Sequence, residues 1–274
     1  MTRATVVKLG GELLEDAEAV RRAAGSIVRM ASRSPLVVVH GGGRAIDGEL
    51  RARGVAPDFV DGLRVTDAAT LDVVVSVLAG RANTALVAAV GAAGGRAVGL
   101  TGADAGIGLS IRAGALETVS GSRVDLGLVG EPCGSKAELV GHLVTLGYVP
   151  VICSIGVDAD GALLNVNADT LAAHLAAAIG AETLIVAGTT GGVLDADGTP
   201  MEELTIGEID ALSESGIAHS GMIAKLRACR RALSAGVARV SIVNGRGGGD
   251  FLDLPGTRIV ARSGVAAAEV EMRA

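Results

Sequence analysis

Apolar positions along the chain follow two alternating patterns. Short apolar runs rich in valine, typical of strands buried on both faces, alternate with longer segments whose apolar residues recur at helical spacing. This alternation predicts an α/β fold with a mostly parallel sheet covered by helices on both faces. The clearest predicted strands are Val6–Leu9, Leu36–Val39, Ala97–Leu100, Val149–Ile152, Thr183–Val186 and Val240–Val243. The predicted helices are Val20–Ala31, Ile46–Arg53, Asp67–Val90 and Asp169–Ile179.

The pattern gives little sign of separate domains. Residues 106–128 are polar and irregular, which indicates a β-hairpin region over a site, and no fixed-period repeat is present. A strand meets a new helix near residues 165–169. We therefore expect one domain over residues 1–274, with an N-terminal half of about 1–165 and a C-terminal half of about 166–274.

Composition excludes several classes of function. The 274 residues are 49% hydrophobic and carry a net charge of −6, so no basic excess exists for general binding of nucleic acid or anionic membranes. No uncharged apolar run reaches about 18 residues, which predicts no membrane span. The three cysteines are too far apart for a zinc site and odd in number, so we expect reduced, buried thiols in a cytoplasmic protein.

Two glycine-bearing turns follow the first two predicted strands. Lys8 precedes Gly10 and Gly11, and the second strand runs through His40 into Gly41–Gly43. Glycine lets backbone N–H groups approach a ligand closely, and the N-terminus of a following helix favours an anion. A lysine inside an apolar strand must reach solvent or a negative partner, because an unpaired buried charge is costly. The turns suggest phosphoryl chemistry on a small acid, with His40 anchoring the second turn.

A polar segment precedes the predicted helix at residue 169. In a strand, Asn165 and Asn167 would face one side, with Asp169 at the start of the helix. A helix N-cap explains the same spacing equally well. The segment alone therefore indicates either a site or a helix start.

Two further cations have alternative interpretations. Arg64 could bind a carboxylate through two hydrogen bonds, or it could form a surface ion pair with Asp67. Lys225 lies in an arginine-rich helix that follows Ser220–Met222, where it could be either functional or simply solvated.

The common nucleotide-binding fingerprints are missing. The stretch around Gly41 lacks the last glycine of GxGxxG, and GxxxxGK[ST] occurs nowhere in the sequence. Residues 134–136 have the letters of a P-loop ending in the wrong order. A dehydrogenase or a P-loop enzyme is therefore disfavoured.

The order of the motifs resembles the amino acid kinase family. Lys-x-Gly-Gly is followed by His-Gly-Gly-Gly, Arg-Val-Thr, Asn-x-Asn-x-Asp and Gly-Met-x-x-Lys, and the similarity covers nearly the whole chain. It implies a three-layer α/β/α sandwich with the amino-acid substrate in the N-terminal half and the nucleotide in the C-terminal half. The similarity is greatest to members that transfer the γ-phosphoryl group of ATP to the side-chain carboxylate of N-acetyl-L-glutamate, on the route to arginine.

The resemblance also implies roles for individual residues. Lys8 and Lys225 would flank the transferring phosphoryl group, and Asp169 would hold both lysines. Gly10 and Gly11 would contact phosphate. Mg²⁺ would be carried by the ATP phosphates, without a dedicated carboxylate site on the protein.

Other positions match ligand-contacting parts of the family. The acetylated amino acid would be bound by Gly42, Gly43, Arg64 and Asn165, with Arg64 pairing the α-carboxylate. The nucleotide would be contacted by Thr189, Thr190, Gly191, Gly192, Val193 and Leu194, and by Ile217, Ala218 and His219.

One departure from the family pattern concerns the nucleotide. The family usually has Thr-Asp or Ser-Asp where this chain has Gly188-Thr189, which puts nucleotide positioning in doubt. The chain also lacks the extra N-terminal helix of arginine-inhibited, ring-forming members, so we expect an arginine-insensitive homodimer.

Two alternatives remain open. One is a kinase for aminoadipate held on a carrier protein, which the Arg-Val-Thr motif and the charge of −6 disfavour. The other is an amino-acid sensor, an idea that Thr189 motivates. A sensor has no need of two transition-state lysines, so Lys8 and Lys225 argue against it.

Overall fold

The centre of the fold is an eight-stranded sheet in the order β14-β16-β15-β13-β1-β2-β10-β5. The computed structural model describes residues 4–117, 121, 123–195, 197–215 and 220–261. Neighbouring strands from β15 to β5 pair in parallel, whereas β15 and β16 pair antiparallel. The strands are β1 (Thr5–Leu9), β2 (Leu36–His40), β5 (Ala97–Thr101), β10 (Val149–Cys153), β13 (Thr183–Gly188), β14 (Glu203–Thr205), β15 (Arg239–Asn244) and β16 (Gly256–Val260).

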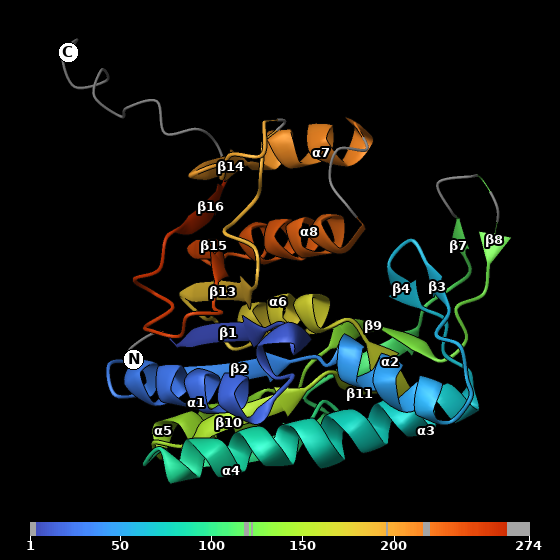
Figure 1. The fold of residues 1–274 in the computed structure, drawn as a ribbon, viewed down its shortest axis with the longest axis horizontal. Helices are drawn as coiled ribbons and strands as arrows, with labels where there is room; N and C mark the ends of the chain where they lie inside the picture. The colour runs from blue at the N-terminus through green and yellow to red at the C-terminus, as the bar shows by residue number, and fades with distance from the viewer. Residues whose placement is uncertain (1–3, 118–120, 122, 196, 216–219, 262–274) are drawn as a thin grey trace.

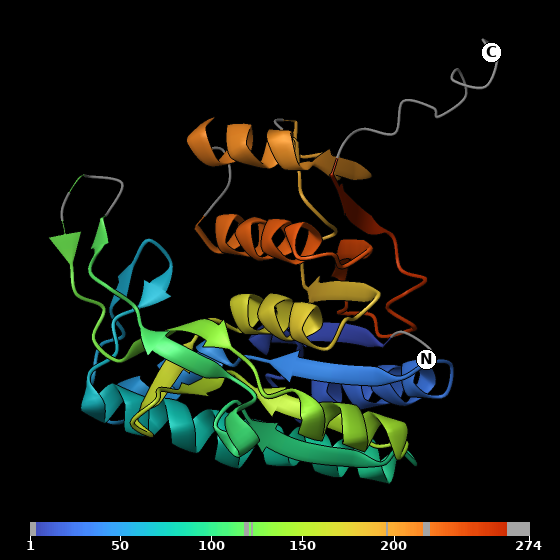
Figure 2. The same ribbon diagram turned by 180° about the vertical axis from the view of Figure 1, so that it is seen from behind.

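Helices cover both faces of this sheet (Figures 1 and 2). Val7 and Val38 pack in one core with α1 (Ala17–Ala31) and α4 (Thr84–Ala92), while Val6 and Val37 pack in another with α6 and α8. Successive strand residues face opposite ways, so each continuous apolar run supplies both cores. The predicted three-layer α/β/α sandwich is confirmed. The second face carries α5 (Glu138–Thr145), α6 (Ala168–Ala178) and α8 (Ser220–Ser234), and α7 (Ile206–Ser215) packs on α8.

The longest helical segment runs from Ala68 to Ala92. It joins α3 (Ala68–Val75), the π-helical η2 (Ser76–Asn83) and α4, and the Asp67 carboxylate caps its start by accepting a hydrogen bond from the Thr70 amide at 2.7 Å. By length and composition alone this helix could cross a membrane, with 39% of its most apolar window buried in the fold. Its buried part packs against α1 and β5.

A smaller β structure stands beside the main sheet. β6 (Leu109–Arg112), β9 (Val129–Gly134), β11 (Ile155–Val157) and β12 (Leu163–Val166) close into a four-stranded barrel. The predicted hairpin region at 106–128 is present in part: β7 (Leu116–Glu117) pairs with β8 (Arg123–Val124), but β6 pairs with β9, outside that region. Residues 118–120 and 122 lie outside the described residues. The remaining short elements are η1 (Gly11–Leu13), α2 (Gly43–Ala52), β3 (Phe59–Val60), β4 (Leu63–Arg64) and η3 (Asp104–Gly106).

The cysteines differ from expectation in one respect. All three are free, and Cys153 and Cys229 are buried as predicted, but Cys133 is exposed. Cys133 lies on β9, whose side chains alternate between the barrel interior and solvent. The prediction of three buried thiols was therefore wrong for Cys133.

Candidate active site

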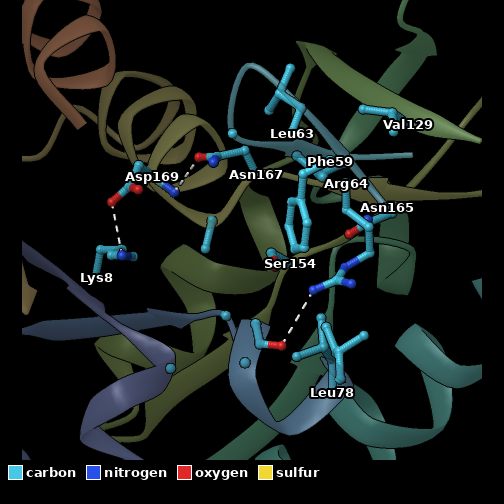
Figure 3. A pocket seen from close by; sticks show the side chains of 18 of the residues that line it. Lys8, Phe59, Leu63, Arg64, Leu78, Val129, Ser154, Asn165, Asn167 and Asp169 are labelled. Atoms are coloured by element: carbon cyan, nitrogen blue, oxygen red, sulfur yellow. Dashed lines mark hydrogen bonds and ion pairs between the residues drawn. The ribbon is translucent and has the colours of Figure 1, made fainter. Parts of the chain in front are cut away.

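A pocket of about 240 Å³ opens where β1 and β2 end, the edge at which open α/β sheets bind ligands. Its walls come from the turns after these strands, the β3–β4 hairpin, β12 and the start of α6 (Figure 3). The structure therefore brings together segments far apart in the sequence. The predicted site residues that line it are Lys8, Gly11, Gly42, Gly43, Arg64, Asn165 and Asp169.

The two glycine turns touch each other at the floor of this pocket. A Cβ atom on Gly11 would stand 2.7 Å from the Cα atom of Gly42, so only glycine fits there. Gly42 also marks the N-terminus of the ten-residue helix α2, which begins at Gly43. Backbone N–H groups at such a helix start favour an anion. The turns therefore bring two glycine-bearing segments and a helix N-terminus together in the pocket.

Lys8 is buried and pairs with Asp169. The lysine shares a strand face with Val6, which points toward α6, and its Nζ lies 2.9 Å from Oδ1 of Asp169 in the first turn of that helix. Both residues are only 6% exposed. Of the two alternatives for Lys8, solvent or a negative partner, the second is right, and the partner is Asp169, as the family resemblance implied.

Arg64 is buried with one nitrogen left without a partner. Nη2 bonds to Asp47 on α2 and to the Gly43 carbonyl, and the guanidinium lies 4.5 Å from the centre of the Phe59 ring. Nη1 is buried and makes no hydrogen bond within the described structure. The alternative of an ion pair with Asp67 is wrong, because that carboxylate caps α3. An acid entering the pocket would satisfy Nη1.

The two asparagines have different roles. Asn165 lies on β12, where its Nδ2 donates to the Thr66 hydroxyl at 3.0 Å. Asn167 caps α6, its Oδ1 accepting from the amides of Asp169 and Thr170. The N-cap interpretation is therefore right for Asn167, and it fixes Asp169 in the first helical turn opposite Lys8.

The predicted nucleotide-contacting residues do not line this pocket. Thr189 and the residues up to Leu194 follow β13, and the amide of Val193 donates to the Thr257 hydroxyl at 2.8 Å. Ile217, Ala218 and His219 lie outside the described residues. Gly10 and Lys225 do not line the pocket either, although Gly10 donates a backbone hydrogen bond to the Ala187 carbonyl at 2.8 Å.

Lys225 approaches the pocket from α8. Its Nζ lies 3.4 Å from the point where a Cβ atom on Gly188 would stand. Burial raises the pKa of the nearby Cys229 thiol, as does the charge of Asp169, whereas Lys8 and Lys225 lower it, so all three charges lie around that thiol. Among the described residues, however, Asp169 makes an ion pair with Lys8 and none with Lys225.

His40 supports the second turn, as predicted. Its Nδ1 lies 3.1 Å from the Gly41 carbonyl, and its Nε2 lies 3.1 Å from Nδ2 of Asn83, which also donates to the Val151 carbonyl. Burial lowers the pKa of His40 to about 4, and the contact with the Gly41 carbonyl offsets this in part. His40 is therefore neutral at pH 7 and holds the backbone without taking part in charge chemistry.

Four residues of this region were missed by the sequence analysis. Glu12 follows the first glycine pair directly, and Phe59 is one of only two phenylalanines, so both carried a signal that could have been followed. Asp47 and Asn83 carried none, because they lie in helices where polar residues are ordinary.

Comparisons with known proteins agree with this geometry. Residues 3–244 match the Amino acid kinase family. An acetylglutamate kinase from Koribacter versatilis is 41% identical over 87% of this chain and 89% of its own length. Another acetylglutamate kinase, from Synechocystis sp., is 44% identical over 89% of this chain and 81% of its own length.

Solved structures show the same fold. An N-acetylglutamate synthase from Neisseria gonorrhoeae, complexed with coenzyme A and N-acetyl-glutamate, superposes with a TM-score of 0.81 at 25% identity. The match covers 95% of this chain but only 60% of the synthase. A carbamate kinase from Giardia lamblia bound to AMP-PNP gives a TM-score of 0.64 at 17% identity over 95% of this chain and 99% of that one. The chain belongs to the amino acid kinase family.

Proposed function

We propose that this chain phosphorylates the side-chain carboxylate of N-acetyl-L-glutamate with ATP, giving N-acetyl-L-glutamyl 5-phosphate for arginine synthesis in the cytoplasm. The observation that carries the proposal is a pair of buried cations, Lys8 and Arg64, on opposite sides of one small pocket (Figure 3). Two separated cations suit an acid with two carboxylates. The curated relatives named acetylglutamate kinase point to the same substrate.

Each cation would receive one carboxylate of the substrate. The free Nη1 of Arg64 would bind the α-carboxylate, with Asn165 beside it. The side-chain carboxylate would then lie near Lys8 and the turn at Gly11 and Gly42. This places the reacting group at the phosphate-binding end of the pocket.

The reaction needs no general base, because a carboxylate is already a nucleophile. One carboxylate oxygen forms a bond to the γ-phosphorus, the bond from that phosphorus to the β–γ bridging oxygen breaks, and ADP leaves with the electron pair. Lys8 and Lys225 would neutralise the charge on the transferring group. Within the described residues, no three His, Cys, Asp or Glu side chains gather as a metal site. We therefore assign Mg²⁺ to the phosphates of ATP, where it would neutralise part of their charge.

The nucleotide would lie on the C-terminal half. Thr189–Leu194 follow β13, and Lys225 faces the end of the same strand, next to the pocket that we assign to the acid. The division into halves near residues 165–169 would then separate acid from nucleotide.

The test of this proposal is ATP-dependent formation of an acyl phosphate, trapped with hydroxylamine. The acids to compare are N-acetyl-L-glutamate, L-glutamate and L-aminoadipate, and we expect product only from the first. Turnover of none of them, with ligand binding intact, would instead favour the carrier-bound aminoadipate kinase or the sensor.

Arg64→Ala is expected to raise KM for N-acetyl-L-glutamate by roughly 10²-fold with a smaller change in kcat. The charge-assisted contact of Nη1 with the substrate carboxylate is lost, and this weakens binding of the ground state as much as binding of the transition state. Steady-state kinetics with Arg53→Ala, an exposed arginine paired with Glu49, provide the control. An unaltered KM would remove Arg64 from the carboxylate site.

We also propose a homodimer formed through the long helix and the sheet edge. β5 is the last strand of the sheet, and the exposed face of α4 beside it carries small apolar residues. The open edge of a sheet and an exposed apolar helix face beside it are normally covered in a native protein. A second copy of the chain would cover both.

Ala88→Arg is expected to convert this dimer to a monomer without unfolding it. Ala88 is exposed on α4, so arginine fits the isolated chain but places an unpaired charge in the interface. Light scattering after size exclusion measures the change, with exposed Ala235→Arg as the control. A wild-type chain that elutes as a monomer would contradict the proposal.

A further inference from the structure

We propose that Glu12 is a positioning residue, whose carboxylate holds Lys225 at the phosphate-binding turn across the bare backbone of Gly188. The inference rests on the proposed phosphoryl transfer, in which Lys225 supplies a cation. Asp169 pairs with Lys8, so within the described residues Lys225 has no ion-pair partner. The inference assigns Glu12 as that partner.

The side chain of Glu12 folds back over the first glycine turn. Its carboxylate atoms lie 2.5 to 2.6 Å from the point where a Cβ atom on Gly10 would stand. Glu12 is half-buried and lines the pocket. The described structure contains no ion pair or side-chain hydrogen bond for it. An unpaired carboxylate thus stands where phosphate is expected to bind, which is unfavourable for phosphate unless a cation lies close by.

Lys225 reaches the same place from the other side. At Gly188, the last residue of β13, a Cβ atom would lie 3.2 Å from Oε1 of Glu12 and 3.4 Å from Nζ of Lys225. The two opposite charges therefore approach the same point without forming an ion pair in the described structure, and a side chain at residue 188 would contact both of them. Gly188 is one of the two positions at which the chain departs from the family pattern.

This arrangement explains why an acid is tolerated at a phosphate site. With Lys225 present, the carboxylate is balanced and restrains a long, flexible side chain that would otherwise have to be ordered during the reaction. Without Lys225, the same carboxylate would only repel phosphate. Glu12 should therefore favour phosphoryl transfer when Lys225 is present and weaken phosphate binding when Lys225 is absent.

A double-mutant cycle tests whether the effect of Glu12 depends on Lys225. The proteins are wild type, Glu12→Gln, Lys225→Met and the double variant, with Glu18→Gln, an exposed carboxylate paired with Arg22, as the control. Measurements are kcat, KM for both substrates and the Kd for AMP-PNP with and without Mg²⁺, after equal unfolding curves in urea establish that each protein is folded.

We expect Glu12→Gln to lower kcat by about 10-fold in the wild-type background, with KM for the acid changed less than about 2-fold. In the Lys225→Met background, the same change should leave kcat unaltered and tighten binding of AMP-PNP. Glu18→Gln should alter nothing.

Two results would overturn the proposal. Equal effects of Glu12→Gln in both backgrounds would show that Glu12 acts independently of Lys225. A loss confined to binding of AMP-PNP with Mg²⁺ in both backgrounds would make Glu12 a metal ligand instead. If wild type phosphorylates none of the acids tested, the proposed substrate fails, but the cycle on AMP-PNP binding still decides the role of Glu12.

A steric variant gives an independent check. Gly188→Ala keeps both charges but places a methyl group close against both of them, so one or both must shift, and it should lower kcat toward the level of Glu12→Gln. Gly141→Ala on α5, where a Cβ atom would meet nothing within 4 Å, is the matched control. A fully active Gly188→Ala enzyme, with Glu12→Gln equally active, would contradict the proposal.

Discussion

Lys225→Ala is expected to lower kcat by about 10²-fold or more while leaving KM for both substrates comparatively unchanged. A cation that meets the transferring phosphoryl group stabilises charge that develops in the transition state, so its removal acts on kcat. The lysine is half-buried on α8, and its Nζ points to the end of β13 beside the proposed acid site. Its position suits a group that acts on phosphate rather than on the acid.

The control for this variant lies on the same helix. Arg227→Ala removes a cation two residues along α8, on an exposed side chain that faces away from Lys225. Steady-state kinetics with N-acetyl-L-glutamate and ATP should give wild-type values for Arg227→Ala. A Lys225→Ala enzyme with unchanged kcat would refute the role assigned to Lys225.

The fold was predictable because local patterns determine it. Strands buried on both faces require uninterrupted apolar runs, and β1, β2, β10 and β13 are buried along their whole length. The long helical segment from Ala68 is a second example, because its extent was predicted from the apolar pattern over Asp67–Val90. The order of motifs identified the family, and the match over residues 3–244 confirms it.

Contacts between distant residues were harder to predict. The family resemblance implied that Asp169 holds Lys8, but the local sequence alone left solvent or a negative partner open, because the contact depends on how α6 lies over β1. Arg64 shows this limit more clearly. Its buried bond to Asp47 arises because the β3–β4 hairpin folds back over α2, an arrangement that neither segment specifies alone.

The role of a glycine can depend on neighbours that are distant in the sequence. In the sequence, Gly188 is only a departure from a family motif. In the structure, Glu12 and Lys225 both lie close to the point where its Cβ atom would stand. A missing Cβ atom therefore gains meaning only when the groups around it are known. For this reason, the arrangement at the end of β13 was the least accessible to sequence analysis.

Asp169→Ala is expected to lower the free energy of unfolding by about 3–5 kcal/mol, because it leaves the charge of Lys8 buried and unpaired. The side chains of this pair are only 7% and 8% exposed. Denaturation in urea measures the loss. Glu18→Ala, which breaks the exposed pair with Arg22, is the control, and its effect should stay below about 1 kcal/mol.

The double variant Lys8→Met with Asp169→Ala separates stability from activity. Neither charge remains, so most of the lost stability should return, since an apolar replacement of a buried ion pair is often neutral. Phosphoryl transfer should be lost as well, because Lys8, the cation at the phosphate-binding end of the pocket, is gone. A double variant less stable than Asp169→Ala alone would mean that the pair itself holds the fold together. Recovery of stability without recovery of kcat would mean that an apolar pair could fill this place equally well for the fold. The buried charge at the end of β1 would then be kept for the reaction.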